Sequence, residues 1–260
     1  MDLTSLVLKD GALTRAAGRV VGYDGQVWFE PPMPVPPLAN QPVRPSGWGV
    51  LTRGVDLLAL TNRHERDGGV EGRAVFAGEW RQERLHVLEQ QAQRLPDPSP
   101  NPRWGRPPCS PPTHGWPHSE PGPEYEPGVN LSPRPPHPIP GATAVTVFRP
   151  APTQVVLVVA TTEPAQAEAL LRPLYGDAVC IVPSRWTAGE IEVVRAAINR
   201  HLTEWLIFGA GQTSAEDGQA LPYANVTRLI PKMADWARSI PTGLLDVRVW
   251  LTPQTPPTPA

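Results

Sequence analysis

The chain has 260 residues, of which 40% are hydrophobic, so it is long enough and apolar enough to form two domains. Its 23 basic and 25 acidic residues leave a formal charge of −2 at pH 7, and the balance holds along the chain: 11 basic and 11 acidic residues in 1–94, 3 and 4 in 95–140, and 9 and 10 in 141–260. No segment is therefore basic enough to bind nucleic acid by charge alone.

The apolar runs and the cysteines predict neither a membrane-spanning protein nor a disulfide-rich one. The longest apolar run, VVLVVA at 155–160, is too short to span a bilayer. The first residues include an acidic second position and no small-residue cleavage site, so they do not predict a secretory signal. Cys109 and Cys180 stand in different kinds of segment and predict no disulfide framework. We expect a cytoplasmic protein.

The N-terminal residues 12–30 predict a β-hairpin. Two short apolar runs flank Asp24 and Gly25, and Asp-Gly is the dipeptide that a tight hairpin turn prefers. A proline-rich loop follows, and residues 47–55 then resume an extended pattern.

A short helix and a second hairpin complete this segment. Asp56 predicts the N-cap of the helix, His64 lies in a charged surface turn near its end, and Gly68 stops it. Residues 70–80 and 84–90 then alternate apolar and polar side chains, as the two strands of a hairpin do. Four or five strands within about 90 residues predict a small OB-like β-barrel, and we assign residues 1–94 to it.

OB-like barrels often bind single-stranded nucleic acid through aromatic side chains in a positive groove. The barrel segment offers five large aromatics: Trp28, Phe29, Trp48, Phe76 and Trp80. Because acidic residues cancel the basic ones, we expect these aromatics to form barrel core or domain contacts, and nucleic-acid binding is kept only as an alternative.

Residues 95–140 form a connector, because 17 of these 46 residues are proline. A floppy linker would lack tryptophans, which are costly to leave in water. We therefore expect Trp104, Cys109 and Trp116 to pack against a domain.

The same connector carries the strongest metal-like pattern in the chain. Cys109, His114 and His118 lie within ten residues of each other, and His137 could be the fourth ligand that a zinc site needs. The intervening prolines disfavour the short helix or knuckle that holds such ligands. We expect no metal and no other cofactor.

Residues 141–260 predict an α/β domain with one helix-covered sheet. Strand-like runs at 144–161, 178–184, 205–211, 223–230 and 244–251 alternate with helical segments. The helix at 191–202 is the clearest of these, because Thr187 and Glu190 form a capping-box pattern. The element order is that of a ferredoxin-like sandwich, so the overall fold class is α+β.

Two strand-to-helix junctions could hold an anion on backbone N–H groups. Thr162 lies at the first, while Arg185 and Thr187 lie at the second. Helix capping alone explains the threonines. Cys180, inside a strand, is predicted to be a small buried hydrophobe.

The stretch WGRPPCSPPTHGWP resembles a WxxPPCxPPxxGWP-like connector found in a family of uncharacterised actinobacterial proteins. Other stretches, such as VEGRAVFAGEW and YGDAVCIVPSRW, strengthen the resemblance, which covers most of the chain. The family implies no activity, so no catalytic residue is carried over.

These patterns favour a binding or scaffolding protein with an unidentified protein partner and no catalytic site. The alternative is an enzyme whose cleft lies between the domains, for which His201, or Arg185 with Glu190, would be the first groups to inspect.

Overall fold

The computed structural model describes residues 3–32, 42–93, 105–118, 135, 138–151 and 153–254. It has a mixed α+β fold that consists mostly of sheets. Trp104 and His137 lie outside the described residues. None of the helices in the described ranges is long and apolar enough to cross a membrane.

The N-terminal strands close into a ring. The elements are η1 (Leu3–Leu6), β1 (Leu13–Tyr23), β2 (Gln26–Glu30), β3 (Val50–Arg53), η2 (Leu57–Ala59), β4 (Thr61–Arg66), β5 (Gly69–Arg81) and β6 (Arg84–Ala92). Strand β1 pairs with β2 and also with β5, while β2 pairs with β3, β3 with β6, and β6 with β5. Five strands are thus joined in a circle, and β4 pairs with β5 in addition. The word barrel is used below only as a short name for this circle of paired strands.

Turn residues explain where these hairpins fold. The predicted hairpin of β1 and β2 is confirmed: Asp24 and Gly25 have φ angles of 50° and 69° between paired strands. The predicted helix after Asp56 is largely wrong. Asp56 does accept a hydrogen bond from the Leu58 N–H (2.9 Å), but η2 has only three residues. Asp67 then begins a positive-φ turn, so the chain before it pairs with β5 as a strand.

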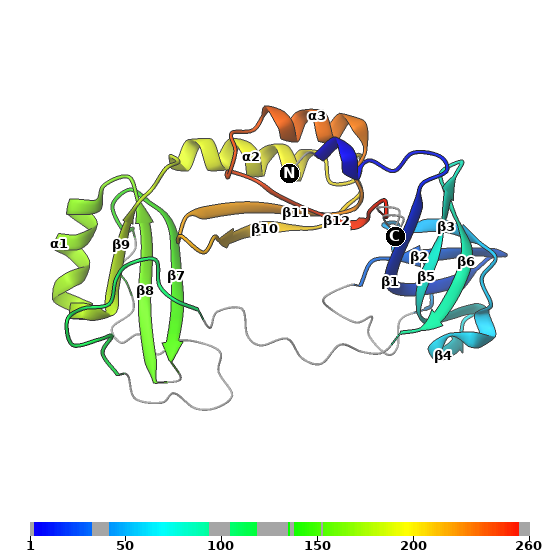
Figure 1. Cartoon of the computed structure of the whole chain (residues 1–260), viewed down its shortest axis with the longest axis horizontal. Coiled ribbons are helices and arrows are strands. Elements are labelled where there is room, and N and C mark those ends of the chain that lie inside the picture. Colours follow the sequence, from blue (N-terminus) through cyan, green and yellow to red (C-terminus); the bar gives the residue numbers. More distant parts are fainter. Residues whose placement is uncertain are drawn as a thin grey trace, which may run out of the picture.

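The C-terminal part forms two three-stranded sheets (Figure 1). Its elements are β7 (Ala142–Ala151), β8 (Gln154–Thr161), α1 (Pro164–Tyr175), η3 (Gly176–Ala178), β9 (Val179–Pro183), α2 (Ala188–Arg200), β10 (Ile207–Ser214), β11 (Ala220–Arg228), α3 (Pro231–Ser239) and β12 (Asp246–Leu251). In both sheets two antiparallel strands are followed by a helix and by a strand parallel to the second.

The expected single ferredoxin-like sheet is therefore not what the strand pairings form. Strand β8 is apolar on both faces, with Leu157 and Val159 turned to α1 and Val156 and Val158 turned the other way. Its sheet needs its own cover on each side. The two sheets touch instead through side chains, such as the Gln212 amide that donates to the Thr143 carbonyl (3.1 Å).

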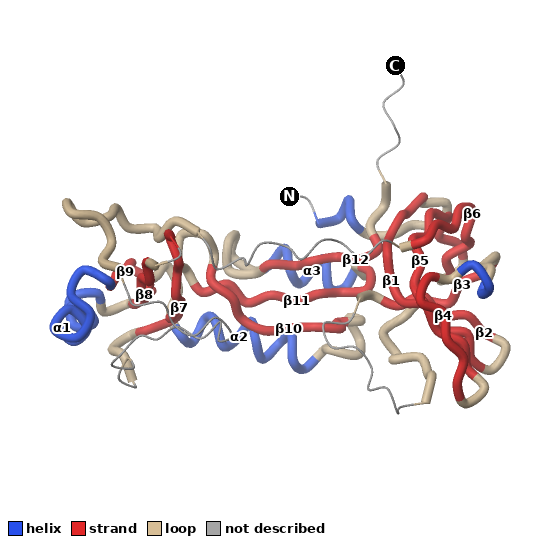
Figure 2. Tube along the Cα trace, turned by 90° about the horizontal axis from the view of Figure 1, so that it is seen from below, coloured by secondary structure: helices blue, strands red, loops and turns tan. Residues whose placement is uncertain are grey.

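Figures 1 and 2 place the sheet β10–β12 between the barrel and the sheet β7–β9, with α2 and α3 on one of its faces. The capping box of α2 is confirmed. The Thr187 hydroxyl accepts from the Glu190 N–H (3.2 Å), and the Glu190 carboxylate accepts from the Thr187 N–H (2.7 Å). Ile198 is buried, whereas Leu202 lies beyond the helix end and is half-buried.

The barrel and the C-terminal part share residues. Leu251, at the end of β12, belongs to the barrel's hydrophobic cluster and is fully buried. The neighbouring Trp250 lies with its ring centroid 4.7 Å from that of Phe29 and donates from Nε1 to the Ala17 carbonyl (3.0 Å). In the opposite sense, Leu6 packs onto the cluster under α2 and α3. A residue near the C-terminus thus packs in the N-terminal core, and a residue near the N-terminus packs against the C-terminal core.

Candidate functional site

The described connector residues 105–118, here called the strap, cover one face of the sheet β7–β9. Trp116 is 8% exposed and packs with Val156, Val158 and Cys180, while α1 covers the opposite face. The Gln154 side-chain amide donates to the Trp116 carbonyl (3.0 Å). The strap supplies the second cover that the two-sided strand β8 requires.

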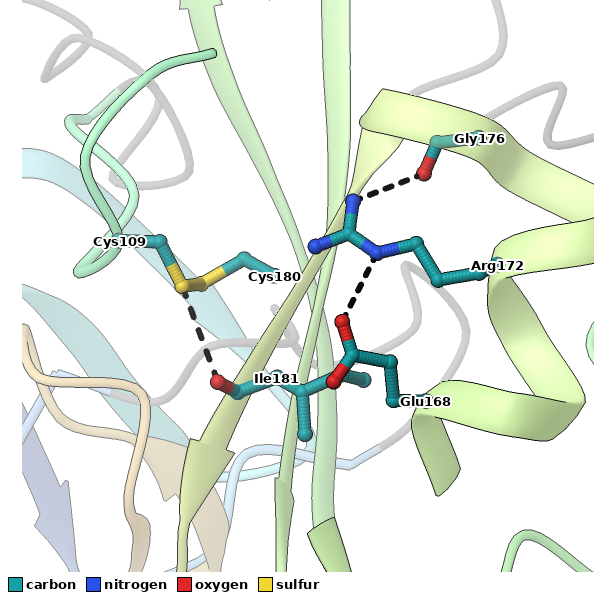
Figure 3. The surroundings of a disulfide bond; sticks show 6 residues. All are labelled: Cys109, Glu168, Arg172, Gly176, Cys180 and Ile181. Carbon is teal, nitrogen blue, oxygen red and sulfur yellow. Dashed lines mark hydrogen bonds and ion pairs between the residues drawn. A yellow bond between two sulfur atoms is a disulfide. The ribbon is translucent and has the colours of Figure 1, made fainter. Parts of the chain in front are cut away.

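A disulfide joins the strap to strand β9, which corrects two predictions (Figure 3). Cys109 and Cys180 are bonded, with their Cα atoms 5.8 Å apart. Cys180 is buried, as predicted, but it is not a free thiol, and the chain does contain a disulfide. The cysteines are separated by 71 residues, and only the packing of the strap against β9 brings them together.

The disulfide also removes the thiolate from the metal pattern of the connector. Zinc is bound by deprotonated sulfur, which a bonded cysteine lacks. His114 is exposed, and a hydrogen bond of 2.8 Å joins the His118 Nδ1 and the Thr153 hydroxyl. Within the described ranges no three histidine, cysteine or carboxylate side chains gather as a metal site.

The two strand-to-helix junctions proposed for an anion are occupied by internal contacts. The Thr162 hydroxyl lies 3.4 Å from the Gly141 carbonyl. Arg185 forms an ion pair with Asp217, and its N–H donates to the side chain of Gln219 (2.9 Å). Thr187 is used in the capping box. Thr162 is not the N-cap of α1 as expected: Glu163, one residue later, holds that position, and the helix begins at Pro164.

The acid–base candidates do not converge. His201 stacks on Trp205 and bonds through Nδ1 to Glu204 (2.7 Å), which also pairs with Lys232. Glu190 stays in the capping box, where hydrogen bonds from Thr187 hold the pKa of Glu190 below its ordinary value. A shallow depression of about 130 Å³ lies nearby between α2 and β10. Its volume is below the roughly 300–1,000 Å³ of a small-molecule pocket.

A buried ionic network in the barrel has no counterpart among the predicted sites. Arg19 on β1 donates from Nη1 to the fully buried Glu30 (2.8 Å) and from Nε to Glu71 (2.8 Å). The loop before β3 is tied to it, because the Ser46 N–H donates to Glu30 (2.5 Å). His64 on β4 contacts the other oxygen of Glu71. The alternation of β1 could have shown that Arg19 faces outward, but not which carboxylates meet it.

The network holds Glu71 in its ionised form. Burial acts to raise the pKa of Glu71, but hydrogen bonds and charge from Arg19, helped by His64, outweigh it and lower that pKa. The second ring nitrogen of His64, Nδ1, lies 3.2 Å from the Asn62 carbonyl. Both ring nitrogens of His64 thus lie against oxygen atoms, one of the Glu71 carboxylate and one of the Asn62 carbonyl.

Glu71→Gln is expected to lower the free energy of unfolding at pH 7 by about 1–3 kcal/mol, because a charge-assisted hydrogen bond to Arg19 weakens. A carboxyl with a lowered pKa stabilises the fold above its ordinary value of 4.5, and this contribution is lost as the pH falls through the native pKa. The difference between wild type and variant, measured by urea unfolding, should therefore shrink below pH 4.5.

The control is Glu65→Gln on the same hairpin, where the carboxylate is 58% exposed and pairs with Arg63. This substitution should leave stability nearly unchanged at every pH. If the stability difference between wild type and Glu71→Gln stays constant down to acid pH, the charged network is contradicted.

An aromatic side chain and several basic ones lie in register on the outside of the barrel. Trp28 pairs with Leu51, Leu51 with Arg84, and Arg84 with Arg81, which forms one row across β2, β3, β6 and β5. The next row places Arg53 beside His86, and His86 beside the acidic Glu79 of β5. The side chains between these positions are buried. They are Phe29, Thr52, Leu85 and Trp80.

We call this surface the β2–β6 outer face, made up of Trp28, Leu51, Arg53, Arg81, Arg84 and His86. Arg53 and Arg81 are exposed, and the other four side chains are partly exposed. The barrel aromatics were predicted to be core or contact residues. Phe29, Phe76 and Trp80 are buried in the core, and the Trp48 carbonyl accepts from Thr227 of β11 (2.6 Å), whereas Trp28 stands on the outer face.

No family model matches the chain, and no curated protein or solved structure matches it either. The resemblance to the actinobacterial connector family therefore stays a prediction.

Proposed function

We propose that the chain is a binding or scaffolding protein without a catalytic site of its own. The observation that supports this is that its candidate reactive side chains are engaged in contacts that hold the fold together. Cys109 is bonded to Cys180, Glu190 caps a helix, and Arg185 is paired with Asp217. An enzyme would need two or more titratable groups aimed at one cleft.

We propose further that the N-terminal part is an OB-like barrel. The ring of β1, β2, β3, β6 and β5 is consistent with a five-stranded Greek-key barrel, to which β4 is added. We keep 1–94, 95–140 and 141–260 as the barrel, connector and α/β domain, with Leu251 as a residue that the last domain contributes to the first.

Site-specific photo-crosslinking in living cells tests the binding function. A benzoylphenylalanine is placed, one position at a time, at the large hydrophobic side chains that are most exposed among the described residues. These are Leu13, Leu58, Leu88, Val145, Leu174 and Val193. A binding protein should give adducts at one position or at neighbouring positions.

Adducts at none of the six positions would contradict a binding function. The enzyme alternative has its own readout, which is a time-dependent change in the small molecules of a cell extract incubated with the purified protein. A binding protein should leave those small molecules unchanged.

A further inference from the structure

We propose that the β2–β6 outer face binds single-stranded nucleic acid, an inference that rests on the proposed binding function. Strand surfaces that bind single strands combine aromatic side chains, on which bases stack, with basic groups that follow the phosphates. Strand pairing brings Trp28, Arg84 and Arg81 into one row, and Arg53 lies in the next row.

The positive charge of the β2–β6 outer face does not help to stabilise the fold. Arg81 and Arg84 are directly opposite each other across the hairpin of β5 and β6, an arrangement that repels and destabilises a sheet. Glu79 pairs with Arg81 (2.6 Å) and offsets one charge. Arg53 and Arg84 have no ion pair with any described carboxylate, although the whole chain carries two more acidic than basic residues.

The shape of the face favours a single strand over a duplex. It is the surface of a sheet, not a projecting helix or ribbon that could enter a major groove. Trp28 is partly exposed on its strand, and it can stack only on a base whose own face is free. Leu51 lies between Trp28 and Arg84 in the row, so it offers an apolar surface that a base next to Trp28 could contact.

Fluorescence anisotropy on the full chain tests the proposal, with labelled oligothymidylate and oligouridylate of about 20 nucleotides, longer than the site of one OB-like barrel. Three arginines that contact phosphates predict a slope of about −2 for log K against log salt concentration. Arg84→Gln and Arg53→Gln should each make that slope shallower by about 0.7. The DNA and RNA arms show which sugar the face accepts.

Trp28→Ala should weaken binding about 5- to 150-fold through lost stacking, whereas Trp28→Phe should retain most of the affinity. The phenylalanine variant keeps the test valid if the alanine variant is unstable. Arg200→Gln is the matched control, because Arg200 is exposed at the end of α2 and is not part of the β2–β6 outer face, so its loss should change neither affinity nor slope.

Two results would overturn the inference: no binding of either oligonucleotide at low salt, or binding that the Trp28 and Arg84 variants leave unchanged. If oligonucleotides fail while photo-crosslinks to a protein form at Leu88 on β6, the face belongs to a protein partner. In that case the binding function stands and the nucleic-acid ligand does not.

Discussion

Cys109→Ser is expected to lower the free energy of unfolding by up to about 4 kcal/mol. The disulfide joins residues that are 71 positions apart in the sequence. In the chain-entropy description, closing a loop of that length lowers the conformational entropy of the unfolded chain, which stabilises the native state by about that amount. The native state should lose order in the strap as well, since few backbone hydrogen bonds hold residues 105–118 to the sheet. Guanidinium unfolding, with and without a dithiol reductant, measures the effect.

Reduction of the wild type should reproduce the stability of Cys109→Ser, and the variant itself should not respond to reductant. His114→Ala serves as the control, because this exposed strap residue should have almost no effect on stability. Two reactive thiols per folded, air-oxidised chain would contradict the disulfide.

The disulfide also bears on the predicted cytoplasmic location. Disulfides persist in oxidising compartments and are rare in the cytosol, where thiols are kept reduced. The location stays a prediction that the thiol state of Cys109 in intact cells tests directly. Trapping thiols with an alkylating reagent before lysis separates a bonded pair from a reduced one.

Local signals in the sequence predicted local structure well. Asp24-Gly25 forms the turn of the first hairpin, and Thr187 and Glu190 form the capping box. Each of these depends on a few adjacent residues, whose conformational preferences are strong enough to survive in the folded chain.

Contacts between distant residues were not predictable from the same patterns. The spacing of Cys109 and Cys180 carries no information on pairing, because packing of the strap decides it. The number of sheets depends on which strand edges meet, and element order alone does not define that. Of the β2–β6 outer face, alternation could have shown that Trp28 points away from Phe29, but the row with Arg84 needed the parallel pairing of β3 with β6.

Leu251, near the C-terminal end of the chain, packs in the core of the N-terminal barrel. We therefore expect Leu251→Ala to lower the free energy of unfolding by about 2–5 kcal/mol. Leu251 is fully buried, and its cluster is built mainly from residues of β1, β2, β5 and β6. Next to it, Trp250 lies so near β1 that a Cβ on Gly18 would come within 2.7 Å of the Trp250 ring. The end of β12 therefore acts as part of the barrel wall and core.

Amide hydrogen exchange locates that effect, because Leu251→Ala should speed exchange in β1 and β5, which lie far earlier in the chain, as well as in β12. Leu88→Ala is the matched control: the same substitution on β6, at a side chain that is 67% exposed, should change stability by less than about 0.5 kcal/mol. Faster exchange confined to β10–β12, with β5 still protected, would mean that the two parts keep separate cores. Faster exchange in β1, β5 and β12 alike would show that the N-terminal and C-terminal parts unfold together.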